Sequence, residues 1–357
     1  MGTIFLDSAA NHYDATQVLM KYSADFSGWT RTASGRTGTY CLVSPGSTAG
    51  FPSFTNDTLY LNLTANYARI CVGAAFKISG NQNGFLGTGA TIPLFAFGAN
   101  SNTQVSVMAG IDGSFLAFAT YSNSPTATRL GRSSPNIFRP NTWQYIEADV
   151  TFNSATGSVT IYHNGTAVLT ITGVNTSPNL DGGGLPLNYA NQIGLMDFKP
   201  GGTKYVADIY FSQAVGHYGD VSVETCFPTG AGANTQWTPS AGANWQCVSE
   251  IVPDGDTSYV EDSTVGDRDT YAMGNLSGGI TSVVCAQNII NARKTDSGGR
   301  QIASVIRSGG ANFDGTGQAT SSAYLFYWQD YDTDPNTAAA WTVANINAVE
   351  AGEKVIA

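Results

Sequence analysis

A chain of 357 residues is long enough for about two domains, each with its own hydrophobic core. Charged residues make up only 12% of it, whereas glycine occurs 41 times and aromatic residues reach 11%, which is typical of many strands joined by tight turns. The formal net charge of −10 argues against a protein that grips nucleic-acid phosphates, and no apolar run is long enough for a membrane-spanning helix.

The negative charge belongs to the last part of the chain. Residues 1–218 carry ten acidic and ten basic side chains, whereas residues 219–357 carry sixteen acidic and six basic ones. This change in composition predicts a domain boundary near Gly219. We therefore expect an N-terminal domain of residues 1–218 and a smaller, acidic C-terminal domain of residues 219–357.

The first residues indicate a short helix and no export signal. Met1 to Asp7 contain no basic segment followed by a long apolar one, so we expect the protein to be made and assembled in the cytoplasm. Asp14 and Gln17 are placed to cap a helix over Ala15–Tyr22.

The five cysteines are odd in number and form no C-x-x-C pair, and in the cytoplasm we expect thiols rather than disulfides.

Strand patterns dominate the N-terminal domain. Apolar and polar residues alternate from Trp143 to Phe152, which predicts a strand with one face in the core. The next two strands, Ser158–His163 and Thr166–Thr172, are joined at Asn164-Gly165, a dipeptide preferred in tight hairpin turns. Many strands without intervening helices predict an antiparallel sandwich. The further strands expected here are Leu59–Leu63, Ala68–Ile78, Gln104–Met108, Phe115–Tyr121, Gln192–Phe198 and Lys204–Ser212.

The C-terminal domain is expected to be a second, smaller β-sandwich. Its opening stretch, Thr229–Gln246, is rich in glycine, alanine and asparagine and indicates an ordered loop. Near the end, Thr342 is placed to cap a helix over Val343–Ala351, with Gly352 just past its last residue. The strands expected between them are Asp269–Met273, Ile280–Lys294, Arg300–Arg307 and Ser322–Tyr331.

Several of these segments resemble known protein families. The strands from Trp143 to Asn175, with Ile193–Asp197 and Tyr205–Phe211, resemble the central and closing strands of a concanavalin A-like or laminin G-like jelly roll. Other segments resemble parts of tailed-bacteriophage virion and tail proteins. The latter segments are Ile4–Ser8, Gln236–Trp245, Ser263–Asp269, Val305–Gly310 and Asp334–Thr342.

The resemblance implies a non-enzymatic structural component of a tailed phage virion, in a tail fibre, tail tip or head-decorating position. Such a protein assembles in the host cytoplasm, contacts other virion proteins and forms a homo-oligomer, for which we favour a trimer because virion parts occupy symmetric positions. It can also adhere to host-surface glycans. The alternative is a lectin or a glucanase-like carbohydrate-active module, because the fold alone does not define the function.

One strand carries the candidate glycan-contact face. Trp143, Tyr145, Glu147 and Asp149 alternate along it and point the same way, so the aromatic rings could stack on a sugar. The two acids are spaced as in a two-carboxylate glycosidase site. In some laminarinase-like glucanases, a Glu-x-Asp pattern is followed, a few residues later, by a second glutamate. This second glutamate is missing after Asp149. We therefore predict a polar strand face and no catalytic residues.

Two acidic loops are weak candidates for calcium. The first contains Asp254 and Asp256, but it lacks the glycine and the final glutamate of an EF-hand loop. The second contains Asp330, Asp332 and Asp334 and is followed by proline instead of glycine. We interpret both as solvated loops, and we predict neither a metal site nor a cofactor.

Overall fold

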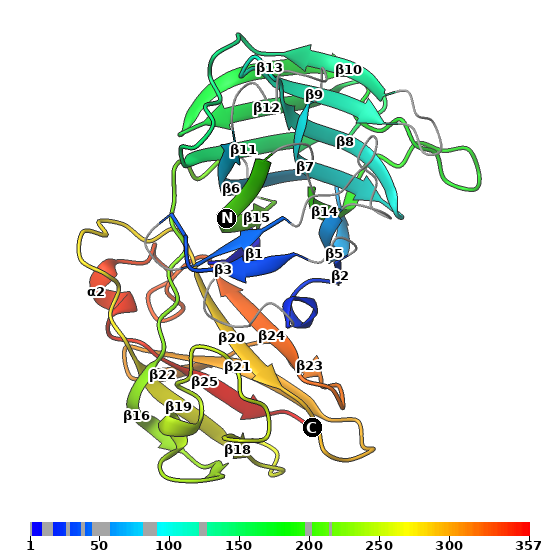
Figure 1. Ribbon diagram of the computed structural model, residues 1–357. Coiled ribbons are helices and arrows are strands. Elements are labelled where there is room, and N and C mark those ends of the chain that lie inside the picture. The colour runs from blue at the N-terminus through cyan, green and yellow to red at the C-terminus, as the bar shows by residue number, and fades with distance from the viewer. Residues whose placement is uncertain are drawn as a thin grey trace. The chain divides into compact units, whose positions relative to one another are not determined.

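The computed structural model describes residues 2–8, 17–25, 29–36, 40–44, 58–80, 91–120, 127–196, 202–213 and 216–357 (Figure 1). The chain divides into two compact units between Val223 and Glu224, a few residues beyond the predicted boundary at Gly219. Within the described ranges, no helix is long and apolar enough to cross a membrane. The two units are described separately below as unit 1 and unit 2.

Unit 1 is a sandwich of two antiparallel sheets. The first has eight strands in the order β13-β12-β11-β6-β15-β4-β3, and β1 also pairs with β15; the second has seven in the order β10-β9-β8-β7-β14-β5-β2. Neighbouring strands are often far apart in sequence, as a jelly roll requires, and this confirms the predicted fold. The strands are β1 (Thr3–Asp7), β2 (Ala24–Asp25), β3 (Thr30–Thr32), β4 (Cys41–Val43), β5 (Thr58–Tyr67), β6 (Arg69–Gly80), β7 (Ile92–Ala99), β8 (Asn102–Ala109), β9 (Phe115–Thr120), β10 (Ala127–Arg132), β11 (Gln144–Thr151), β12 (Gly157–His163), β13 (Thr166–Val174), β14 (Ala190–Met196) and β15 (Gly202–Ser212).

The core of unit 1 follows from the alternation along its strands. Ile146, Ala148 and Val150 of β11 are fully buried, as predicted. In the same core, the rings of Phe76 on β6 and Phe95 on β7 meet edge to face with centroids 5.1 Å apart. Because β6 and β7 belong to different sheets, this contact links the two layers through the middle of the sandwich.

The hairpin predicted from the Asn164-Gly165 dipeptide is confirmed. β12 and β13 pair in antiparallel register, and the turn between them places Asn164 at φ 48° and Gly165 at φ 77°. Both angles lie in the left-handed region that this kind of two-residue turn needs. The dipeptide therefore fixes the register at one edge of the first sheet.

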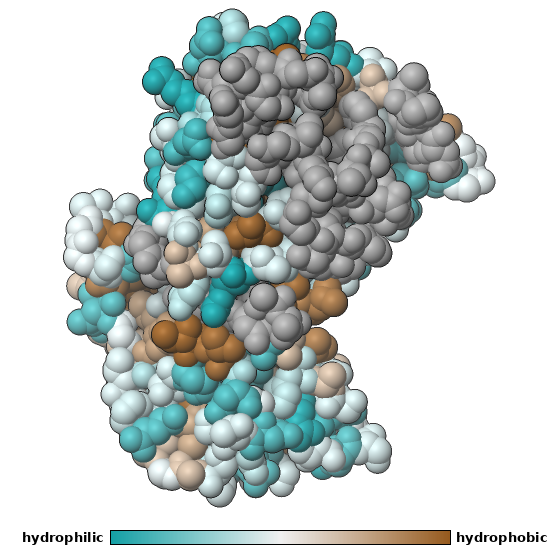
Figure 2. Space-filling model, in the orientation of Figure 1, coloured by the Kyte–Doolittle hydropathy of each residue, from teal (hydrophilic) through white to brown (hydrophobic). Residues whose placement is uncertain are grey.

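Unit 2 consists of a six-stranded sheet and a two-stranded ribbon that contacts it, with one further small strand pair. The sheet has the order β16-β19-β25-β21-β22, with β23 also paired to β21, and the ribbon is formed by β20 and β24. In the view of Figure 2, this unit presents mostly hydrophilic and neutral side chains, with a patch of hydrophobic ones among them. Its elements are β16 (Pro228–Thr235), β17 (Thr238–Pro239), the 3-10 helix η2 (Asn244–Cys247), β18 (Val260–Glu261), β19 (Arg268–Met273), β20 (Ala286–Ala292), β21 (Gln301–Ser308), β22 (Ala311–Asp314), β23 (Gln318–Ala319), β24 (Leu325–Tyr331), the helix α2 (Val343–Ile346) and β25 (Glu350–Val355).

The expected loop over Thr229–Gln246 is wrong, because most of it is regular structure. β16 pairs with β19 along the edge of the sheet, and its residues alternate between half-buried and exposed. A Cβ atom on Gly232 would lie 2.4 Å from the carbonyl oxygen of Thr270. The small residues that suggested a loop therefore allow this strand to approach its neighbour closely.

The two predicted helices are also shorter than expected. Thr342 does cap α2, since its hydroxyl accepts from the Asn345 backbone N–H at 3.1 Å, but the helix ends at Ile346 and Glu350–Val355 forms β25. Near the N-terminus, the 3-10 helix η1 covers only Val18–Met20, and the predicted cap Asp14 lies outside the described residues. For α2 the local signal was correct for one turn, and strand pairing of Glu350–Val355 determined the rest.

Gly352 lies on the central strand of the unit 2 sheet, where a neighbouring strand leaves no space for a side chain. It was expected to end a helix, but it lies within β25, where a Cβ atom would be 2.0 Å from the carbonyl oxygen of Asp269. We expect Gly352→Ala to lower the free energy of unfolding of unit 2 by about 2–3 kcal/mol, measured by urea denaturation. Gly278→Ala is the control, because no atom lies within 4 Å of the added carbon, and it should change stability by less than about 0.5 kcal/mol. Equal effects of the two substitutions would contradict the close approach.

All five cysteines lie among the described residues and carry thiols. Burial raises the pKa of Cys41 to about 11 and also raises the pKa of Cys71. Because the thiolate is the reactive form, we expect both to resist alkylation in the native protein and to react after denaturation. Mass spectrometry should then find five labels, and labelling of native Cys71 as fast as that of half-buried Cys226 would contradict its burial.

Candidate functional site

The structure brings Trp143, Tyr145, Glu147 and Asp149 to one sheet face, but most of that face is covered. Tyr145 and Glu147 are 0% exposed and Asp149 is 7% exposed, whereas Trp143 is half-buried. The cover is the segment 216–223, which contributes Tyr218 and Val221 to the cluster over this face. The predicted polar strand face is therefore largely inaccessible to a glycan, because a segment distant in sequence folds over it.

Glu147 holds this covering segment in place. Its Oε1 atom accepts hydrogen bonds from the Tyr210 hydroxyl at 2.5 Å and from the backbone N–H groups of Tyr218 and Gly219 at 2.9 Å each. Its Oε2 atom lies 2.9 Å from Nδ1 of His217. A buried carboxylate with this many partners is a structural anchor, and it has no free position for a substrate.

Asp149 and Tyr145 are engaged as well. Asp149 forms a two-pronged ion pair with Arg69, in which Nε donates to Oδ1 at 2.8 Å and the second nitrogen donates to Oδ2. The Tyr145 hydroxyl donates to the backbone carbonyl of Asp208 at 3.0 Å. The two carboxylates on β11 therefore serve separate structural contacts instead of flanking a bond to be cleaved.

The acids of the first calcium candidate bond to the protein itself. Asp254 accepts from the backbone and the hydroxyl of Ser258 at 3.1 and 2.9 Å. Asp256 pairs with Arg293 at 2.8 Å. In the described part of the chain, no three His, Cys, Asp or Glu side chains gather closely enough to hold a metal ion.

In the second calcium candidate, Asp334 is the best defined acid. It is almost fully buried and accepts from the Ser308 hydroxyl at 2.7 Å and from the Asn345 amide at 2.9 Å, so it ties loops together. Asp330 accepts from the Gln287 amide at 2.7 Å across the β20-β24 ribbon. Asp332, which lies between them, belongs to no cluster of metal-ligating side chains in the described residues.

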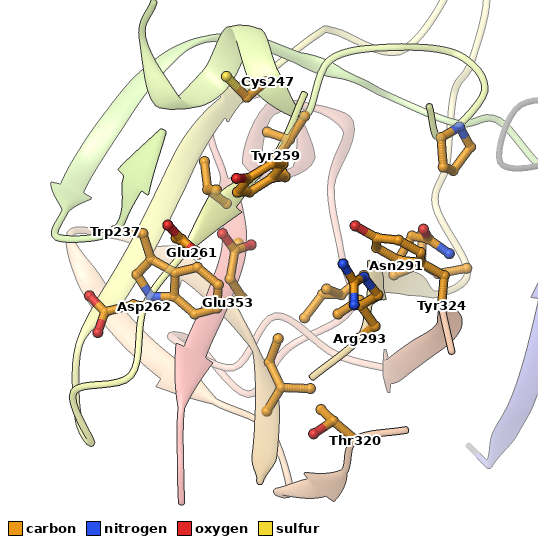
Figure 3. Close-up of a pocket in the computed structure, with 18 of the residues that line it drawn as sticks. Trp237, Cys247, Tyr259, Glu261, Asp262, Asn291, Arg293, Thr320, Tyr324 and Glu353 are labelled. Carbon is orange, nitrogen blue, oxygen red and sulfur yellow. The ribbon is translucent and has the colours of Figure 1, made fainter. Parts of the chain in front are cut away.

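Unit 2 contains a cavity of about 950 Å³ that sequence reasoning did not find (Figure 3). We call it the unit 2 pocket. Strands β19 and β25 of the sheet, β20 of the ribbon and the loop residues 253–264 contribute to its lining. Aromatic and carboxylate side chains are prominent there together with an amide and a guanidinium group: Trp237, Tyr259, Tyr271, Tyr324, Glu261, Asp262, Glu353, Asn291 and Arg293.

One residue of the pocket wall, Glu353, belongs to a buried acidic pair. Asp269 on β19 and Glu353 on β25 are directly opposite in register, and the hydroxyl of Tyr271 lies 3.1 Å from Oδ2 of Asp269 and 2.5 Å from Oε1 of Glu353. Burial raises the pKa of Glu353 to about 8 and also raises the pKa of Asp269. One phenolic proton cannot serve both carboxyl groups at once, and the pKa of about 8 indicates that Glu353 is the acid that carries its own proton at neutral pH.

The rim of the pocket is held by its own contacts. On one side, the guanidinium of Arg293 stacks over the Tyr324 ring at 5.3 Å, and the Tyr324 hydroxyl donates to Asp256 at 2.8 Å. On the other side, Nε1 of Trp237 donates to the backbone carbonyl of Asp267 at 3.4 Å. Figure 3 shows Trp237 and Glu353 on the side of the pocket opposite Arg293 and Tyr324. The rings are thus oriented without a ligand, as a preformed site requires.

Comparison with known proteins gives no family for the chain: no family model and no curated protein matches it. Among solved structures, the botulinum neurotoxin serotype G binding domain is similar at 11% identity and TM-score 0.34, over 54% of this chain and 45% of that one. The Emp46p carbohydrate recognition domain is similar at 10% identity and TM-score 0.32, over 52% of this chain and 88% of that one. A tetrameric galectin from the sponge Cinachyrella sp. is similar at 11% identity and TM-score 0.30, over 43% and 96%. The chain thus spans less than half of that neurotoxin structure, and identities this low transfer no ligand or activity to this chain.

Proposed function

We propose that the chain is a non-enzymatic carbohydrate-binding protein whose site is the unit 2 pocket. The observation that carries this proposal is the convergence of aromatic rings and polar side chains on one preformed cavity. Trp237, Tyr259 and Tyr324 offer apolar ring faces on which a sugar ring can stack. Glu261 and Asn291 offer acceptors and donors for sugar hydroxyl groups.

The glucanase alternative has less support in this molecule. It relied on Glu147 and Asp149, and both carboxylates are engaged in structural contacts on a covered sheet face. A glycosidase needs one carboxyl group on each side of the bond that it cleaves. Release of reducing sugar by the pure protein, abolished in Glu353→Gln, would replace the binding proposal with an enzymatic one at the pocket.

We further propose that the protein serves in a tailed phage virion, as a tail fibre, tail tip or head decoration, and is assembled in the host cytoplasm. The support is the order of phage-like segments along the sequence. Symmetric virion positions favour a homo-oligomer, and we propose a trimer that contacts other virion proteins. The protein should purify with intact particles in many copies, and its absence from them would contradict this role.

The binding proposal predicts a strong effect of Trp237→Ala. Loss of one stacking face should weaken binding of a glycan at least about tenfold, equivalent to about 1.4 kcal/mol. A glycan array identifies the ligand, and isothermal titration calorimetry then measures the affinity. Trp143→Ala is the matched control, because this half-buried tryptophan lies on the sheet face first predicted to contact glycans. A loss of affinity confined to Trp143→Ala would move the site to β11.

A further inference from the structure

We propose that the unit 2 pocket selects amino sugars, with Glu353 accepting the charged amino group of the ligand, and that it rejects anionic sugars. The sugar part of this inference rests on the proposed function, whereas the charge selectivity rests on the pocket itself. Three features carry it: the balance of charge in the wall, one carboxyl oxygen without a protein partner, and aromatic faces beside that oxygen.

Carboxyl groups outnumber basic groups in the pocket wall, and two of the three basic side chains there are paired with acids, whereas the third, Lys294, donates to the backbone carbonyl of Gly298 at 2.5 Å. Arg293 is paired with Asp256 at 2.8 Å, and Arg300 is paired with Asp296 at 2.7 Å. Several acids have no basic partner within ion-pair distance in the described structure, and their field is concentrated in a cavity with low-dielectric walls. They are Glu250, Asp254, Glu261 and Asp262, whereas Glu353, protonated in the empty pocket, adds no charge to this field.

Glu353 is the group that can accept a hydrogen bond from the ligand. It is only 6% exposed and lines the pocket, and its Oε1 atom is occupied by Tyr271. Within the described residues, no hydrogen bond reaches its Oε2 atom. This oxygen is not among the fully buried polar atoms that lack a partner in the described residues, so it stays accessible from the pocket and can accept from a ligand N–H group.

The surroundings of Glu353 suit a cation in particular. Figure 3 shows Trp237 and Glu261 beside it, so a ring face and a second carboxylate are available to the same ligand group. An ammonium group is attracted to aromatic faces as well as to carboxylates, and tryptophan is the best of these partners. An anionic sugar would place its own carboxylate among these acids and would be repelled.

The inference predicts that binding of a cationic ligand releases a proton from Glu353. Glu353 keeps its proton in the empty pocket, where it faces Asp269 and Tyr271 from β19 and Glu261 from β18, while Ser304 on the other neighbouring strand carries no charge. A bound ammonium group favours the ionised carboxylate. The O–H bond of Glu353 therefore breaks on binding and its proton goes to the buffer, so up to one proton is released for each ligand whose amino group is already protonated before it binds. A neutral sugar releases none.

The test is calorimetry at pH 6.5 on the full chain, in two buffers with different ionisation enthalpies. The probes are oligomers of glucosamine, N-acetylglucosamine and galacturonate, matched in length and respectively cationic, neutral and anionic. We expect the cationic oligomer to bind at least tenfold more tightly than the neutral one, with release of up to one proton, and the anionic oligomer not to bind. Glu353→Gln should bring the cationic-to-neutral ratio close to one and abolish proton release.

Asp332→Asn is the matched control, because it removes one negative charge from unit 2 outside the pocket lining and should leave both affinities unchanged. Equal weakening by the two substitutions would show an effect of net charge only and overturn the inference. Equal affinity of the wild-type protein for cationic and neutral oligomers would also overturn it, while the proposed function stands. Binding of none of the three oligomers would overturn the proposed function and the inference with it.

Discussion

Glu353→Gln is expected to stabilise unit 2 at pH 8 and to flatten the pH dependence of its unfolding. The pKa of Glu353 is raised by burial from 4.5 to about 8 in the folded protein, so between these values the folded state binds more protons than the unfolded state. The free energy of unfolding therefore falls as pH rises through this window. After allowance for relaxation around the buried charge, the loss between pH 5 and pH 8 should be about 2–4 kcal/mol.

This pH dependence can be followed by hydrogen exchange of the β19 and β25 amides, which reports unit 2 within the full chain. The control is Glu350→Gln on the same strand, where a partly exposed ion pair with Arg307 is lost at a cost below about 1 kcal/mol. This control should keep the wild-type slope. Exchange of the wild-type amides that slows or stays constant from pH 5 to pH 8, after correction for intrinsic rates, would show that Glu353 is ionised when buried.

Much of the fold could be predicted where a local pattern and its tertiary use coincide. The Asn164-Gly165 turn is such a case, because the dipeptide alone supplies the backbone angles that close the β12-β13 hairpin. Gly352 is the opposite case. It follows Thr342 and a run of helix-compatible residues, so its position predicts a helix end. In the structure, glycine is needed there because the neighbouring strand β19 approaches too closely for a Cβ atom, and no local sequence pattern contains this information.

The candidate site also depends on contacts between segments that are distant in sequence, which local patterns do not reveal. Alternation along β11 correctly placed Glu147 and Asp149 on one face, but their burial depends on residues 216–223, some seventy positions later. The unit 2 pocket is assembled from residues of eight strands and of the segments between them, which are scattered from Thr225 to Ala357. A signal for it is present in the aromatic and acidic residues between Trp237 and Asp262, but the sequence alone does not show that they line a common cavity.

Glu147→Ala is expected to destabilise unit 1 by about 3–5 kcal/mol, the usual cost of removing one partner from a buried charged network. The substitution leaves the Tyr210 hydroxyl and the backbone N–H groups of Tyr218 and Gly219 without their acceptor, and it opens a void under the covering segment. Glu147→Gln keeps one acceptor oxygen for these donors and should cost less, about 1–2 kcal/mol.

Two measurements separate this anchoring role from a general loss of stability. Urea denaturation gives the free energy, and chymotrypsin cleavage after Tyr218 reports whether the segment 216–223 detaches under native conditions. Cleavage should be at least tenfold faster in Glu147→Ala, because the carboxylate fixes the backbone next to that site. Asp112→Asn is the control, since its exposed pair with Arg132 should contribute less than about 1 kcal/mol. Wild-type stability and wild-type cleavage in Glu147→Ala would mean that packing of Tyr218 and Val221, and not the carboxylate, holds the segment over the sheet.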